Sequence, residues 1–150
     1  MNAAQVKEDF EKCNKVVYDT VGYKMKLLRL PNLAFNDAIV NNVCRDLGMP
    51  CISRTLPGTG DTDSDSTAQT IIARFLQNGE LLEGASYTAR DGAIVLCHMK
   101  QKTLDAMRVI VPALIENGYQ LVTVSEMFEA FGYDEVPFDG NLGVTPIERK

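Results

Sequence analysis

Apolar residues recur along the N-terminal third of the chain with the spacing of amphipathic helices. Over residues 6–17 they fall four, three and four positions apart on one face, and Gly22 follows as a stop signal. Over residues 35–47 they recur every four positions, and the run ends at Gly48. The pattern therefore predicts one helix before Gly22 and a second helix before Gly48.

The C-terminal half predicts three further helices. The first spans residues 68–77, with Asp65 or Ser66 as its cap. The second is a long helix after residue 100, in which Pro112 predicts a local kink. Its predicted apolar face consists of Leu104, Met107, Val111 and Leu114. The third is a short helix that Ser125 caps.

Four short apolar runs between these helices predict strands at residues 24–30, 49–53, 93–97 and 120–124. Helical crossovers between strands imply a mostly parallel sheet with flanking helices, an α/β fold. Four strands are too few to close a barrel. We expect one domain over residues 1–132, followed by an irregular Pro/Gly-rich tail over 133–150.

Composition narrows the classes of function. A net charge of -5 without a Lys/Arg cluster argues against nucleic acid as a partner. No run is apolar enough to span a membrane, and the N-terminus reads as an amphipathic helix and lacks a signal-peptide core. The sequence as written thus predicts a cytoplasmic protein, although a longer parent could be exported.

The chain has a single histidine, His98, which follows the apolar run AIVLC at a predicted strand end. Active sites of parallel α/β proteins lie at the carboxyl ends of strands, so His98 is a candidate catalytic residue. Cys97 precedes it, but neighbours on a strand point to opposite faces, which argues against a Cys–His dyad. A structural histidine is the alternative interpretation.

Three other features have plain interpretations. The four cysteines form no CxxC pair and with one histidine exclude a zinc finger, so we expect reduced thiols. The loop DTDSDS resembles the start of a calcium loop, but Ser66 and Ile72 stand where Gly and Glu are required. It is interpreted as a solvated acidic loop. Arg29 ends the first predicted strand and is expected to pair with a carboxylate.

Two stretches resemble motifs of the polysaccharide deacetylases, the NodB-homology or carbohydrate esterase family four enzymes. KMKLLRLPN (24–32) resembles the family motif "fRPPYG". GAIVLCHM (92–99) and TLDAMRVIVPALIENGYQLVTVSEMF (103–128) resemble the last family motif, "GsIvLlHD…T…al..iip.lk.kGY.fvtvsel". The resemblance covers roughly residues 4–130 and implies part of a distorted (β/α) barrel.

The resemblance also implies roles for individual residues. His98 matches the general acid, and Arg29 matches the arginine that orients the base. Asp65 loosely matches the acidic residue that tunes the histidine, with Ser66 in place of a tryptophan. The backbone N–H of Asn32 stands where the family has an oxyanion donor. The family's divalent metal, usually zinc, is held by one Asp and two His.

This chain departs from the family pattern at the metal and the base. With one histidine it cannot form a two-histidine site, so we expect no cofactor in this chain. The family's first two motifs would lie before its first residue. The matched residues are thus expected to be vestigial, in a degenerate deacetylase inactive as a lone chain.

Two other functions remain open. One is a non-catalytic relative of the family that binds carbohydrate or associates with itself, as a homo-oligomer or with a chain that completes the barrel. Unpaired strand edges and bare apolar surface would favour such association. The other is an unrelated small α/β enzyme with Cys97 or Cys51 as its nucleophile.

Overall fold

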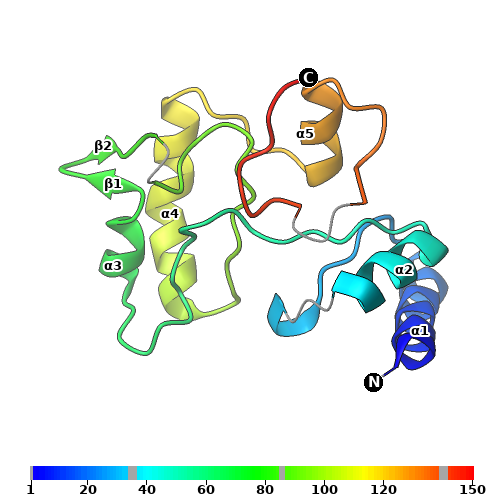
Figure 1. The fold of residues 1–150 in the computed structure, drawn as a ribbon. Coiled ribbons are helices and arrows are strands. Elements are labelled where there is room, and N and C mark those ends of the chain that lie inside the picture. Colours follow the sequence, from blue (N-terminus) through cyan, green and yellow to red (C-terminus); the bar gives the residue numbers. More distant parts are fainter. Residues whose placement is uncertain (1, 34–36, 85–86, 139–141) are drawn as a thin grey trace. The chain divides into compact units, whose positions relative to one another are not determined.

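The computed structural model describes residues 2–33, 37–84, 87–138 and 142–150 (Figure 1). The chain divides into two compact units. Unit 1 consists of Met1–Ser53 and Val136–Leu142, and unit 2 consists of Arg54–Glu135 and Gly143–Lys150. The predicted tail from residue 133 onward has no helix or strand among its described residues, and it contributes to both units.

Unit 1 contains the two predicted N-terminal helices. Helix α1, Ala3–Val21, begins at a capping box between Asn2 and Gln5 and ends at Gly22, whose φ of 70° is left-handed. Helix α2 spans Asp37–Leu47 and is followed by Gly48, which is also left-handed. Both glycine stop signals are thus confirmed. The predicted start of the second helix at residue 35 lies outside the described residues.

A small apolar cluster holds unit 1 together. Leu30, Cys44 and Cys51 are buried, and Phe10 of α1 packs against them with Leu28 and Phe138. Leu28 and Cys51 form an isolated parallel bridge, in which the Leu28 N–H donates to Pro50 O and the Ile52 N–H donates to Leu28 O. The two predicted strands of this unit therefore meet at one bridge, in the predicted parallel sense.

Unit 2 contains the other helices and a short hairpin. Helix α3 spans Ala68–Ile72, helix α4 spans Gln101–Glu116 and helix α5 spans Val124–Ala130. Strands β1, Leu76–Gln77, and β2, Glu80–Leu81, pair in antiparallel register. The predicted helix over 68–77 is thus too long. Asn78 and Gly79 both have positive φ, a hairpin-turn signal that competes with the helical pattern.

The helix caps differ from the predicted ones. Thr67, and neither Asp65 nor Ser66, caps α3 by accepting the Thr70 N–H. Thr123, and not Ser125, caps α5 in a capping box with Glu126. Glu126 lies three residues after Thr123, which is the spacing that a capping box requires.

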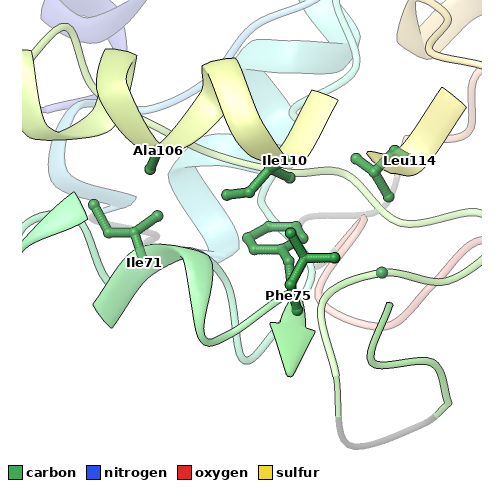
Figure 2. Close-up of a cluster of buried hydrophobic side chains, with 7 residues drawn as sticks. Ile71, Phe75, Ala106, Ile110 and Leu114 are labelled. Carbon is green, nitrogen blue, oxygen red and sulfur yellow. The ribbon is translucent and has the colours of Figure 1, made fainter. Parts of the chain in front are cut away.

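The core of unit 2 lies between α3 and α4 (Figure 2). Ile71 and Phe75 face the side of α4 that carries Ala106, Ile110 and Leu114. The buried face of α4 also includes Thr103, so it is rotated by about one position from the predicted face. Leu104 from the predicted face is 49% exposed. The helix continues through Pro112 to Glu116.

The described residues contain one sheet, the two-stranded β1–β2 hairpin, together with the isolated parallel bridges Leu28–Cys51 and Glu83–Ala89. The predicted strands over 93–97 and 120–124 are not assigned as strands. The mostly parallel sheet is therefore not seen in these ranges, and the partial barrel stays a prediction. Within the same ranges no helix has the length and apolar character needed to cross a bilayer.

Substitutions on α4 test which face is buried. Ile110→Ala leaves a cavity beside Phe75 and is expected to lower the free energy of unfolding by about 2–5 kcal/mol. Leu104→Ala on the predicted face is the matched control and should change it by about 0.5 kcal/mol or less. Urea unfolding of both variants measures this, and equal losses would contradict the observed helix orientation.

Candidate functional site

A polar segment positions the only histidine of the chain. Residues 55–61 run beside residues 94–98, and threonine hydroxyls join the two. The Thr55 N–H donates to Ile94 O and the Ile94 N–H donates to Thr55 Oγ1, both at 2.9 Å. Thr59 Oγ1 donates to Leu96 O at 2.8 Å. One backbone bond and two threonine hydroxyls thus hold the two segments together, and residues 93–97 do not form a regular strand ladder with residues 55–61.

The segment brings the buried carboxylate of Asp61 to His98. Asp61 is 2% exposed. Its Oδ2 accepts the His98 backbone N–H at 2.6 Å and the Thr103 hydroxyl at 3.0 Å, and its Oδ1 lies 2.9 Å from His98 Nδ1. Thr103 belongs to the first turn of α4, so this carboxylate joins the polar loop, the 92–98 segment and the helix.

These contacts keep Asp61 ionised. Burial raises the pKa of Asp61, but hydrogen bonds from the His98 ring, the His98 N–H and Thr103 more than offset it, so the pKa lies below its ordinary value. An ionised carboxylate only accepts hydrogen bonds, so His98 Nδ1 must carry the hydrogen. The imidazole is therefore fixed in orientation and tautomer.

The second ring nitrogen of His98 is available for chemistry. The side chain is 43% exposed, and in the described ranges its Nε2 has no hydrogen bond. A carboxylate behind Nδ1 stabilises the imidazolium ion and orients Nε2 toward an external group. The arrangement suits proton donation or acceptance at Nε2.

Glycine and arginine shape the loop that carries Asp61. Gly60 has a φ of +63°, and a Cβ at this position would lie 2.2 Å from the Arg74 guanidinium carbon. Arg74 Nη2 donates to Asp63 Oδ2 at 3.0 Å. A side chain at residue 60 would therefore be strained and would displace Arg74.

The aspartate that contacts His98 in the structure is not the one that the family resemblance implies. Asp61, and not Asp65, contacts His98, whereas Asp65 is exposed and has no side-chain contact in the described ranges. Asp61 opens the same DTDSDS run, but one sequence alone did not distinguish its aspartates. In the structure Asp61 is distinguished from the other two aspartates by its burial and by the three hydrogen-bond donors that reach it.

Arg29 and Asn32 belong to unit 1. Arg29 is exposed and, in the described part of the chain, has no ion pair, so the predicted carboxylate partner is not found. An exposed arginine needs none, because water solvates it. Asn32 is also exposed and lies in the turn Pro31–Leu33, with a left-handed φ of 54°.

The residues present do not fit the family's metal. The chain has one histidine, whereas that site requires two. Among the described residues no three His, Cys, Asp or Glu side chains converge on one point. We therefore assign no step to a metal held by this chain alone.

Burial makes one candidate thiol a poor nucleophile. Cys44 and Cys51 are each 2% exposed. Burial raises the pKa of Cys51, and it raises the pKa of Cys44 to about 12. Because the thiolate is the reactive form, Cys51 is a poor nucleophile. Cys97 and Cys13 are exposed.

Unit 2 also contains a cavity of about 640 Å³. Residues 118–123 of the α4–α5 connection line it, together with residues 88–95 and residues of α5. Its lining includes neither His98 nor Asp61. This cavity is therefore separate from the Asp61–His98 pair.

Comparison with known proteins finds one informative similarity. The chain is 28% identical over 135 residues to a protein of Pseudobutyrivibrio xylanivorans named bifunctional xylanase/deacetylase. The match covers 88% of this chain and 20% of the relative, so the chain spans about a fifth of that protein. The similarity supports a deacetylase-related family at most. No family model and no solved structure matches the chain.

The lowered pKa of Asp61 predicts an acid-dependent loss of stability. Its folded pKa lies below the unfolded value of about 3.9, so the carboxylate stabilises the fold above that pH and this contribution is lost as pH falls through the folded pKa. Asp61→Asn should remove that part of the pH dependence and cost about 1–3 kcal/mol near neutral pH.

Urea unfolding between about pH 6 and pH 2.5 measures both effects. Asp65→Asn is the matched control, because it removes a carboxylate from the same loop without removing a contact. An Asp61→Asn protein with the pH dependence and stability of the wild type would contradict the assignment.

Proposed function

We propose that this chain carries the general-acid half of a deacetylase site that acts on polysaccharide. In this proposal His98 Nε2 delivers a proton to the leaving group, and Asp61 orients the ring and stabilises its protonated form. The observation that carries the proposal is the buried Asp61 carboxylate, which binds both the ring and the main chain of His98. The similarity to a protein named xylanase/deacetylase supports the reaction class.

The proposed substrates are N-acetylated amino-sugar polymers. This choice rests on the resemblance of the segments around Arg29 and His98 to polysaccharide deacetylases. Hydrolysis of an amide needs an activated water as well as an acid. This chain has one histidine, so a two-histidine metal site needs residues from elsewhere. The lone chain is accordingly proposed to be inactive, with its acid pair intact.

Acetate release tests the proposed inactivity. With zinc added, the lone chain should release no acetate from N-acetylglucosamine oligomers above the background of a His98→Asn variant. Zinc-dependent release by the wild type, lost in His98→Asn, would contradict inactivity and would locate the remaining machinery within this chain.

Binding tests the proposed substrate class independently of turnover. Because His98 is the only histidine, its ring signals in an NMR spectrum are unambiguous. N-acetylglucosamine oligomers at millimolar concentration should shift these signals, whereas unacetylated glucosamine oligomers should shift them less. No shift with the acetylated oligomers would sink the substrate proposal.

A specific observation favours self-association as the second candidate function. Helix α1 has no buried residue, and Val16, Tyr18 and Val21 are each more than half exposed. Contiguous exposed apolar groups mark interaction surfaces, and Tyr18 and Val21 lie three residues apart on one face of this helix. The alternative is a non-catalytic domain that forms a homo-oligomer through α1.

The mass in solution tests this alternative. If α1 mediates association, light scattering should give a mass above that of one chain, and Tyr18→Asp with Val21→Asp should reduce it. Lys12→Asp is the matched control, because it changes the net charge of the same helix by the same amount. A monomer at all concentrations would exclude the alternative.

A further inference from the structure

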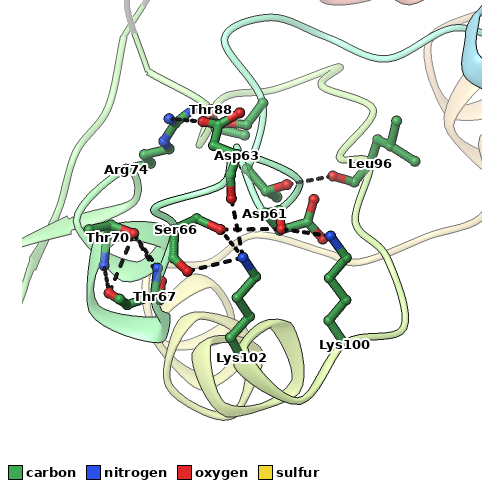
Figure 3. Close-up of polar contacts among 12 residues, drawn as sticks. Asp61, Asp63, Ser66, Thr67, Thr70, Arg74, Thr88, Leu96, Lys100 and Lys102 are labelled. Atoms are coloured by element: carbon green, nitrogen blue, oxygen red, sulfur yellow. Dashed lines mark hydrogen bonds and ion pairs between the residues drawn. The ribbon is translucent and has the colours of Figure 1, made fainter.

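Lys102 reaches into the loop that carries Asp61 (Figure 3). Its ammonium group donates to Ser66 O at 3.0 Å, to Asp63 O at 3.3 Å and to the Ser66 hydroxyl. These acceptors come from residues 63–66 of the acidic loop, whereas Lys102 lies in the first turn of α4. The ammonium group thus donates all three of its hydrogens to one loop.

The loop concentrates negative charge, which a nearby cation offsets. Asp61, Asp63 and Asp65 place three carboxylates within five residues, and like charges at this spacing repel one another. Arg74 pairs with Asp63, and Lys100 Nζ donates to Asp61 O at 3.3 Å. Lys102 adds a further positive charge, half-buried among the loop carbonyls.

A chain of contacts links Lys102 to the candidate site. Ser66, which accepts from Lys102, donates its hydroxyl to Asp61 O at 3.2 Å. The next residue of α4, Thr103, donates to the Asp61 carboxylate itself. The first turn of α4 therefore holds the main chain of the loop through Lys102 and the carboxylate through Thr103.

We propose that Lys102 is a positioning residue, whose ammonium group closes the 61–66 loop and so keeps the Asp61 carboxylate on His98. In the described part of the chain its ammonium group does not contact the imidazole, and it acts through Ser66 and the loop backbone. The role in catalysis rests on the proposed function above. The positioning itself is a property of the folded chain and can be measured without substrate.

The test removes the charge and keeps the aliphatic stem, with Lys102→Met. Two readouts apply, the titration of the Asp61 carboxyl carbon by NMR and the hydrogen exchange of the His98 amide. In Lys102→Met the pKa of Asp61 should rise toward its ordinary value, and His98 amide exchange should become about tenfold faster. His98, Lys100 and the Arg74–Asp63 pair also lie around Asp61, and the substitution leaves them all in place.

Three further variants make the result decisive. Arg108→Met removes a positive charge from the exposed side of the same helix and should change neither readout. Lys102→Arg retains the charge and should restore most of the Asp61 titration. Ser66→Ala removes the hydroxyl link and is milder, so it tests the proposal if Lys102→Met fails to fold.

The outcomes separate the proposal from its alternatives. A Lys102→Met protein that loses stability but keeps the Asp61 titration and the His98 exchange of the wild type would overturn positioning. If both readouts change while N-acetylated oligomers leave the His98 ring signals unmoved, the positioning holds and the proposed function fails.

Discussion

The buried carboxylate of Asp61 is the constraint that joins the loop, the 92–98 segment and the first turn of α4 in unit 2. A charge that is 2% exposed is costly unless it is fully hydrogen-bonded, and Asp61 obtains its donors from the His98 backbone, the His98 ring and Thr103. Meeting that requirement fixes where the loop, the 92–98 segment and the start of α4 lie relative to one another. The hydroxyls of Thr55 and Thr59 complete the arrangement by satisfying the backbone alongside.

The same constraint gives His98 its chemical character. An ionised acceptor at Nδ1 leaves Nε2 as the nitrogen that meets an external group, which is the geometry an acid or base needs. Among the described residues no three His, Cys, Asp or Glu side chains come together in a group that could hold a metal. The function proposed for this pair is that of the acid in a deacetylase site whose remaining residues come from elsewhere.

Local signals in the sequence predicted the ends of the first two helices better than the other elements. The spacing of apolar residues and the glycines at 22 and 48 located the ends of α1 and α2, because glycine readily adopts the left-handed conformation that commonly ends a helix. The end of α3 was missed because the Asn78-Gly79 turn outweighs helical periodicity. The buried face of α4 was off by one position, because Thr103 and Ala106 count as core only once Asp61 and Ile71 lie against them.

The candidate site was predicted in part. His98 could be singled out because it is the only histidine and follows an apolar run. Its partner could not, because Asp61, Asp63 and Asp65 are equivalent in a sequence and differ only in burial and in the donors that reach them. The same holds for Arg29, whose exposure removes the need for the partner that a buried arginine would require.

The tautomer of His98 tests the central claim most directly. In a nitrogen-15 NMR spectrum of the histidine-labelled chain, at a pH where the ring is neutral, the account predicts the hydrogen on Nδ1, donated to Asp61. In Asp61→Asn that preference should weaken. A wild-type ring with its hydrogen on Nε2, unchanged by the substitution, would contradict the account, because the Asp61 carboxylate would then not hold the histidine.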